Sequence, residues 1–207
     1  MYIPPSFAEP DLGVLHDFIE QHSFAVMASQ VDGLPFATHL PFLLEREAGA
    51  KGTLIGHLAR ANPHWKCLES QPVLVVFSGP HAYISPTWYE AENVVPTWNY
   101  AAVHVVGRIR LVDDLADLTD IVQRMVQWYE QPLPNPWTFE DSPFSQKLLP
   151  QIVGLRLEIE SIEGKWKLNQ NHPVERRKKV IAALRAQPHA DSQAVADLMQ
   201  AALPVDP

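Results

Sequence analysis

Arg60, Asn62 and Pro63 stand close together in a segment whose residue types suit phosphate binding. The guanidinium of an arginine is a planar fork that can donate two hydrogen bonds to a phosphate. Asn62-Pro63 is typical of a helix start, with a capping side chain followed by proline in the first turn. Helix N-termini bind anions through free backbone N–H groups and the helix dipole. An ordinary helix cap beside a surface arginine would show the same pattern, so both interpretations stay open.

The segments Tyr83–Tyr89 and Val95–Tyr100 concentrate aromatic and hydroxyl side chains. Within these 18 residues there are two tryptophans and three tyrosines. Aromatic rings beside hydroxyl and amide groups can stack on a flat heteroaromatic ligand and bond its edge. An aromatic core patch with turn-forming prolines would account for the same residues. A ring-binding wall and a packed core are therefore both open.

His39, His57 and His104 all fall on expected strands. They could in principle meet around a metal ion, but the chain has no His-x-x-x-His spacing with a supporting acid. We therefore expect hydrogen-bonded core histidines and no metal site. Cys67 is the only cysteine, which excludes an internal disulfide and a thiolate metal cluster. The sequence also lacks a Gly-x-Ser-x-Gly, a P-loop and a Gly-x-Gly-x-x-Gly.

Short strands joined by turn signals must position these side chains. Apolar runs and alternation predict strands over residues 24–30, 36–44, 53–57, 73–77, 82–85, 100–112 and 152–162. Helical spacing predicts helices after Asp11 and after Asn62, and over residues 115–129, 144–149, 174–185 and 192–203. Strands and helices do not alternate regularly. The pattern thus predicts an α+β fold, an antiparallel barrel with peripheral helices and a helical C-terminus.

Composition indicates an ordinary globular protein of 207 residues, with 46% hydrophobic and 19% charged residues. One domain over residues 1–207 is the simplest organisation, with residues 174–203 as a basic helical appendage. No apolar run reaches the roughly 18 residues that cross a bilayer. The first residues have neither the basic start nor the apolar core of a signal peptide. We expect a soluble, cytoplasmic protein without a membrane partner.

The charge distribution is uneven behind a net charge of −8. Between Lys165 and Arg185 there are seven basic residues and one acid, Glu175, which leaves nine basic and twenty-three acidic residues elsewhere. A basic block on an acidic body indicates an anionic partner, such as a phosphate, a nucleic acid or the acidic face of a subunit. A solvated helix face is the alternative.

Several segments, taken in order, resemble the FMN-binding negative transcriptional regulators, a family that includes regulators of protease synthesis and sporulation. The matching segments are Met1–Pro4, Gly56–Trp65, Phe77–Tyr89, Val95–His104, Ile152–Gly154 and Gly164–Asn171. The resemblance spans nearly the whole chain and is weakest after Arg177. The family is similar to the pyridoxamine-phosphate-oxidase-like split barrels, which are homodimers that hold FMN in a cleft between subunits.

The resemblance implies roles for the side chains described above. Arg60, Asn62 and the helix start would hold the FMN phosphate. Lys167 and Gln170 would close the site, and the strands of His39 and His57 would reach the same cleft. The ring or ribityl chain would be lined by Ser85, Thr87, Trp88, Thr97, Trp98 and Tyr100.

Three functions remain open at this stage. The first is a flavin-binding regulator in which FMN is structural or senses redox state. The second is an FMN-dependent oxidoreductase or flavin reductase, and the third a haem-handling split barrel with one histidine as axial ligand. No proton-transfer residue stands out, which favours the regulator over a dedicated enzyme.

DNA binding would depend on the basic segment 176–185 and the two C-terminal helices, which resemble a helix-turn-helix. The acidic remainder of the chain opposes DNA binding, because such binding neutralises phosphates. Docking of the basic segment onto an acidic face of its own or a partner subunit is the alternative.

Overall fold

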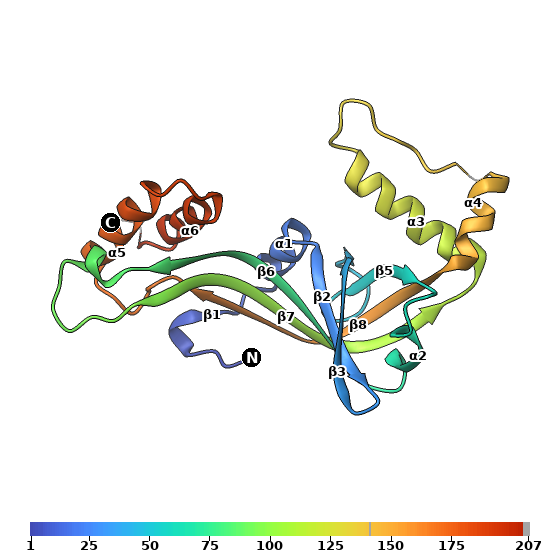
Figure 1. Ribbon diagram of the computed structural model, residues 1–207, viewed down its shortest axis with the longest axis horizontal. Helices are drawn as coiled ribbons and strands as arrows, with labels where there is room; N and C mark the ends of the chain where they lie inside the picture. The colour runs from blue at the N-terminus through green and yellow to red at the C-terminus, as the bar shows by residue number, and fades with distance from the viewer. Residues whose placement is uncertain (141, 205–207) are drawn as a thin grey trace. The chain divides into compact units, whose positions relative to one another are not determined.

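The computed structural model describes residues 1–140 and 142–204, so Asp141 and residues 205–207 of the predicted domain 1–207 lie outside the described part. Strands are formed by Ala8–Glu9 (β1), Phe24–Val31 (β2), Leu34–Pro41 (β3), Leu43–Glu45 (β4), Thr53–Ala59 (β5), Val73–Ile84 (β6), Thr97–Val112 (β7) and Ile152–Lys167 (β8) (Figure 1). The α-helices are Leu12–Gln21 (α1), Trp65–Leu68 (α2), Leu115–Glu130 (α3), Pro143–Leu148 (α4), Val174–Arg185 (α5) and Ala190–Ala201 (α6). Short 3-10 turns are Pro5–Phe7 (η1), Pro86–Tyr89 (η2) and Leu149–Gln151 (η3). Among the described helices, none is long and apolar enough to span a membrane.

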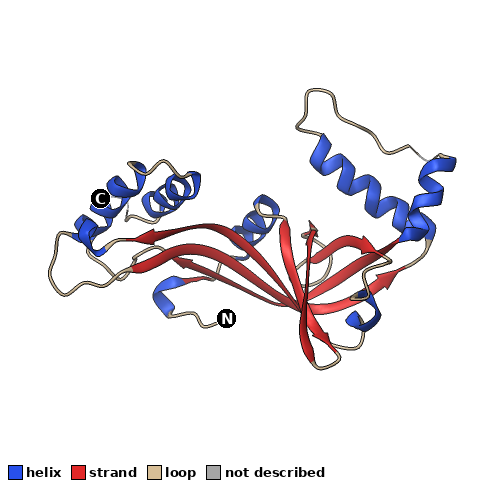
Figure 2. Cartoon of the chain, in the orientation of Figure 1, coloured by secondary structure: helices blue, strands red, loops and turns tan. Residues whose placement is uncertain are grey.

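The strands form one sheet in the order β3-β2-β6-β7-β8-β5-β4, and β1 also pairs with β8 (Figure 2). The pairings β2–β3, β2–β6, β4–β5, β5–β8 and β1–β8 are antiparallel. Asp32 and Gly33 link β2 to β3 with positive φ angles of 51° and 77°, the backbone that a tight hairpin requires. The predicted α+β class with an antiparallel sheet is confirmed.

Several element boundaries differ from the sequence prediction. Residues 73–77 and 82–85, predicted as separate strands, belong to the single strand β6, and Gly79-Pro80 lies inside it. Strand β8 continues to Lys167, five residues beyond the predicted end. The helix after Asn62 is a single turn, α2. Pairing within a sheet overrides local turn signals, which is why strand ends are poorly predicted from one sequence.

The chain divides into two compact units, and β6, β7 and β8 contribute residues to both. We name them the terminal unit, which contains Met1–Leu15, Ser78–Val103 and the residues from Glu163 onward, and the central unit, which contains His16–Phe77 and His104–Ile162. The organisation as one domain stays a prediction.

The core of the terminal unit joins the two C-terminal helices to strand residues. Helices α5 and α6 lie over the ends of β6 and β7 in Figure 1. The buried residues of this core are Ala82, Ile84, Tyr89, Leu168, Val180, Ile181, Leu184, Val195, Ala196 and Met199, with Trp88 and Trp166 packed against them. Residues 174–203, predicted as an appendage, thus supply much of this unit's buried apolar surface.

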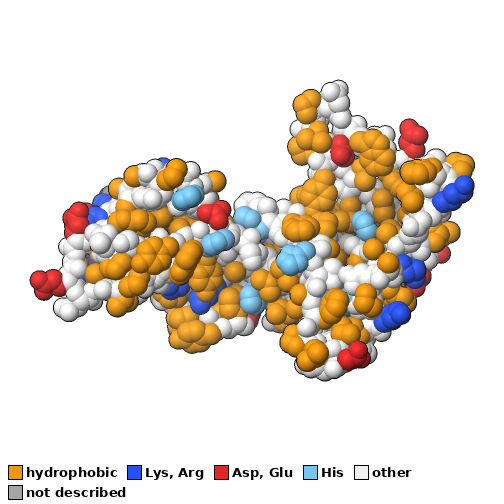
Figure 3. Space-filling model, in the orientation of Figure 1, with side chains coloured by type: hydrophobic (Ala, Val, Ile, Leu, Met, Phe, Trp, Pro, Cys, Tyr) orange, Lys and Arg blue, Asp and Glu red, His pale blue; other side chains and the backbone are white. Residues whose placement is uncertain are grey.

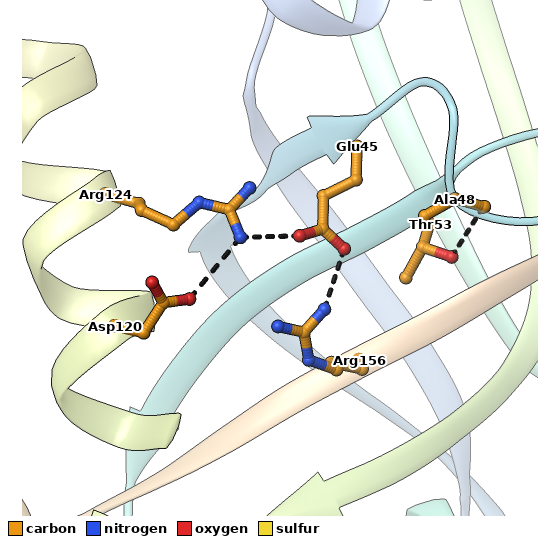
Figure 4. Close-up of polar contacts among 6 residues, drawn as sticks. All are labelled: Glu45, Ala48, Thr53, Asp120, Arg124 and Arg156. Carbon is orange, nitrogen blue, oxygen red and sulfur yellow. Dashed lines mark hydrogen bonds and ion pairs between the residues drawn. The ribbon is translucent and has the colours of Figure 1, made fainter. Parts of the chain in front are cut away.

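In the central unit α3 packs its apolar stripe, Leu118, Ile121 and Met125, against β-strand residues that include Ile55 and Val112. An ion-pair cluster fixes the same helix (Figure 4). The carboxylate of Glu45, at the end of β4, lies 2.5 Å from Nη1 of Arg124 in α3 and 2.7 Å from Nη1 of Arg156 in β8. One half-buried carboxylate therefore links a helix to two strands.

Candidate functional site

The first candidate site in the terminal unit is an aromatic face on β6 and β7. We use this name for His81, Tyr83, Trp98 and Tyr100. The ring centroid of Trp98 lies 5.9 Å from that of Tyr83, edge to face, and 6.0 Å from that of His81. Side chains alternate along a strand, so Trp98 and Tyr100 share one face of β7 while Asn99 between them is buried against α6. Trp98 is 53% exposed, which leaves a ring available for stacking.

Lys165 borders the aromatic face on β8. Its Nζ lies 5.3 Å from the ring centroid of Tyr100 and 5.6 Å from that of Tyr2, and it donates to the carbonyl oxygen of Tyr2 at 3.0 Å. Cations over aromatic rings are attracted by the negative ring face. The aromatic face therefore has a positively charged edge.

Ser85, Thr87 and Trp88 shape the turn η2 beside this face. The Oγ of Ser85 accepts from the backbone N–H of Thr87 at 3.3 Å and lies 2.8 Å from the Thr87 hydroxyl. Trp88 packs against the core under α5 and α6. The two hydroxyls thus stabilise a turn, and the tryptophan takes the packing role that the sequence left open.

Lys167 connects β8 to β7. Its ammonium donates to the Thr97 hydroxyl and, at 2.8 Å, to the carbonyl oxygen of Trp98. Burial, and secondarily the charge of Lys165, lowers the pKa of Lys167. Gln170 holds the turn that follows: its Oε1 accepts from the N–H of Leu168 at 2.8 Å and its Nε2 donates to the Trp166 carbonyl at 2.5 Å. Lys167 and Thr97 are thus brought together, whereas Gln170 is engaged by the backbone.

Arg60, in the central unit, already has several partners. Its Nε donates to the Pro150 carbonyl at 2.9 Å, and its Nη2 donates to the Ile152 carbonyl at 2.9 Å and to Oδ1 of Asp113 at 2.5 Å. Its guanidinium carbon lies 5.7 Å from the ring centroid of Trp65. Helix α2 behind it has only four residues. This geometry ties the end of β5 to η3 and β8, and the phosphate role of Arg60 stays a prediction.

Asn62 belongs to a hydrogen-bonded cluster around the buried His64. The Oδ1 of Asn62 accepts from the backbone N–H of His64, and its Nδ2 donates to the Thr38 hydroxyl, both at 3.1 Å. The ring nitrogens of His64 lie 2.8 Å from Oγ1 of Thr38 and 2.7 Å from Oγ of Ser29. Burial lowers the pKa of His64. His64 was not among the site residues predicted from the sequence, although it directly follows the helix-start signal Asn62-Pro63.

His39 and His57 are separated by their environments. His39 is exposed on β3 and stacks on Phe24 at 6.3 Å between centroids. His57 lines an apolar pocket of about 630 Å³ in the central unit, together with Trp137, Phe139 and Phe144. Its buried Nδ1 has no hydrogen-bond partner among the described residues, and burial lowers its pKa. Burial therefore favours the neutral form of the His57 imidazole.

The predicted site residues fall into both units. Ser85, Thr87, Trp88, Thr97, Trp98, Tyr100, Lys167 and Gln170 belong to the terminal unit, and His39, His57, Arg60 and Asn62 to the central unit. Within the terminal unit the structure brings Lys167 to Thr97 and Trp98, and Lys165 to Tyr100. Lys165, like His64, lies among the contacts that sequence reasoning did not select.

Comparisons with known proteins connect these observations to flavoproteins. A family model described as "Putative FMN-binding domain" matches residues 1–161. The Bacillus subtilis "Protease synthase and sporulation protein PAI 2" is 36% identical over 205 residues, covering 97% of each chain. The flavocytochrome Anf3 of Azotobacter vinelandii has a similar structure, with a TM-score of 0.58 and 20% identity over 77% of this chain and 69% of its own.

A FAD and haem binding protein of Mycobacterium smegmatis is also similar in structure. The TM-score is 0.56 and the identity 18%, covering 85% of this chain and 79% of that one. At such identities the likeness concerns the fold. Together with the antiparallel sheet, it confirms the predicted fold class, that of flavin-binding split barrels.

Proposed function

The chain belongs to the FMN-binding domain family, and from this premise we propose that it is a homodimeric flavoprotein that holds FMN between its two copies and acts as a negative transcriptional regulator. FMN is the cofactor that the family match supports. When bound, it supplies reversible redox chemistry that a regulator can sense. The observation that carries the flavin site is the exposed Trp98 on the aromatic face.

The chemistry of the aromatic face fits a flavin ring. Trp98, Tyr83 and Tyr100 offer ring surface for stacking, and Lys165 gives the edge a positive charge. We assign the flavin ring to the aromatic face and to the positively charged edge that Lys165 gives this face.

Exposed aromatic and aliphatic side chains support a dimer. Hydrophobic side chains are exposed over much of the face drawn in Figure 3. The most exposed large ones in the described chain are Tyr2, Val95, Phe144, Leu34 and Phe24, and Trp137 and Trp98 are also more than half exposed. Exposed apolar surface of this kind marks interaction sites, and a second copy of the chain would cover it in the proposed homodimer.

The basic segment supports docking within its own unit over direct DNA contact. Lys178 pairs with Glu175 at 3.1 Å, and Lys179 pairs with Glu90 in the loop before β7. Arg177 is buried and donates to the Ala202 carbonyl at 2.6 Å. These three cations thus have partners within their own unit. We therefore propose that repression does not depend on segment 176–185 touching DNA.

A titration of the purified protein with FMN and riboflavin tests the flavin site. Stacking on one aromatic ring contributes about 0.5–1.5 kcal/mol, so Trp98→Ala should weaken both flavins by roughly two- to tenfold. Trp128→Ala, at another exposed tryptophan in the central unit, is the matched control and should bind as the native chain does. Absence of flavin binding by the native chain, or equal losses in both variants, would contradict the proposal.

Haem binding is a second candidate function, favoured by His57 on the wall of the apolar pocket, where burial favours the neutral imidazole. A neutral imidazole is a common axial ligand of haem iron. Titration with hemin should then give a Soret band that His57→Ala removes. A spectrum of free hemin with the native chain would exclude this candidate.

A further inference from the structure

A second pocket, in the terminal unit, has polar and cationic side chains in its lining beside the apolar Phe7, Val94 and Val95. Its volume is about 360 Å³. Its walls include Tyr89, Thr97, Lys167, Asn169, His172 and Arg176, and none of the described residues that line it is Asp or Glu. We call it the cationic pocket. Lys167 comes from β8 and Arg176 from the first turn of α5, so two separate elements bring positive charge to one cavity.

Tyr89 organises the walls of the cationic pocket. The ring of His172 is stacked on the ring of Tyr89, with 5.2 Å between centroids and 18° between planes, and the guanidinium carbon of Arg176 lies 5.7 Å from the Tyr89 centroid. Nδ2 of Asn169 donates to the Tyr89 hydroxyl at 3.0 Å. Both Tyr89 and Asn169 are 3% exposed. Buried, hydrogen-bonded groups therefore fix the positions of the cationic ones.

The backbone around the cationic pocket is unusual. In the described part of the chain four non-glycine residues have positive φ, and two of them, Asn93 at 56° and Asn169 at 61°, line this pocket. A third, Glu90 at 47°, directly follows Tyr89. Such conformations are costly and cluster at ligand sites, where the surrounding structure maintains them.

Several side chains of the cationic pocket carry hydrogen-bond donors. Nη1 of Arg176 donates to Nδ1 of His172 at 3.0 Å, so the imidazole proton resides on Nε2, which is a further donor. Burial lowers the pKa of His172, and the charges of Arg176 and Lys167 lower it further. The pKa of Lys167 is lowered in the same direction by burial and by Lys165. The charges of Arg176 and Lys167 thus disfavour protonation of His172, and a bound anion would offset these charges.

We propose that the cationic pocket binds a phosphate group, either that of a phosphate monoester or inorganic phosphate. Arginine offers a planar fork and lysine a point charge, a combination that suits a tetrahedral dianion. The flavin proposal assigned the ring to the aromatic face and left the phosphate unassigned, and Nε and Nη2 of Arg60 already donate to Pro150, Ile152 and Asp113. The cationic pocket would bind phosphate whether or not the chain binds flavin.

Inorganic phosphate is the first probe, titrated into the full-length chain at constant ionic strength against sodium chloride. It should raise the Tm of the native chain, and Arg176→Gln should weaken phosphate binding about tenfold or more, because a charge-assisted pair is lost. Lys167→Gln is a second variant on a different element and should behave alike. Lys178→Gln, two residues further along α5 and outside the pocket, is the matched control and should keep the native response.

FMN and riboflavin distinguish the two sources of phosphate. If Arg176→Gln weakens FMN tenfold and leaves riboflavin unchanged, the bound phosphate is that of the flavin. If FMN binding is unchanged while inorganic phosphate is lost, the pocket serves another phosphorylated ligand. No Tm response to phosphate in the native chain, or the same response in Arg176→Gln and Lys178→Gln, would overturn the inference. Failure of the native chain to bind any flavin would contradict the flavin proposal alone.

Discussion

Replacing Arg60 by alanine separates a role in folding from a role in phosphate binding. The side chain donates to the carbonyls of Pro150 and Ile152, each at 2.9 Å, and pairs with Asp113 at 2.5 Å. The ion pair is well exposed, at 36% for Arg60 and 58% for Asp113, so it contributes roughly 0–1 kcal/mol. Each carbonyl hydrogen bond contributes about 1 kcal/mol. Arg60→Ala should therefore lower the free energy of unfolding by about 2–3 kcal/mol.

Urea unfolding and flavin titrations on the same Arg60→Ala protein measure both roles. Arg108→Ala is the matched control, because Arg108 forms an exposed pair with Glu160 at 3.2 Å in the same unit, and it should leave stability nearly unchanged. The affinity ratio of FMN to riboflavin should stay at its native value. Unchanged stability with a selective loss of FMN would refute this reasoning and assign Arg60 to the flavin phosphate, as the family resemblance implies.

Three further predictions follow from contacts and charges elsewhere. Glu45→Ala leaves Arg124 and Arg156 without their shared carboxylate, so the free energy of unfolding in urea should fall by about 1–3 kcal/mol. A smaller fall than that of Arg108→Ala would contradict a stabilising role of this cluster. Burial lowers the pKa of His64 from its ordinary 6.5, so the unfolded chain takes up the proton more readily. Stability should then fall as the pH drops below 6.5, and less steeply in His64→Gln; pH-independent stability would be inconsistent with this environment. Reversing Lys178 and Lys179 to glutamate should leave retention on DNA unchanged. It should lower stability slightly, because the ion pair of Lys179 with Glu90 is replaced by two like charges. Loss of DNA retention would instead support direct DNA contact by this segment.

Most of the secondary structure could be predicted from the sequence, because it is encoded locally. The apolar spacing of α1 and α3 follows one helical face, and α5 has the predicted bounds of 174–185. Strand ends could not be predicted, since the continuation of β6 through Pro80 depends on neighbouring strands that are distant in sequence. The burial of α5 and α6 in a shared core was hidden for the same reason.

The candidate site was predictable as a set of residue types and less so as a set of contacts. Lys167 and Thr97 are 70 positions apart, and only the adjacency of β7 and β8 brings them together. The sequence suggested a phosphate-binding arginine at position 60 because spacing alone does not show that Asp113 and two carbonyls already engage it. Arg176 entered the sequence interpretation as part of a charge block, whereas its place beside Tyr89 and His172 is a tertiary feature.

Sedimentation velocity with detection at flavin wavelengths tests the central claim most directly, since it reports cofactor and assembly together. After incubation with FMN and removal of free flavin, the flavin absorbance should sediment with a protein species of twice the 23.3 kDa chain mass. Protein that sediments at the mass of one chain, with the flavin absorbance left behind, would contradict a homodimer that holds FMN between its two copies.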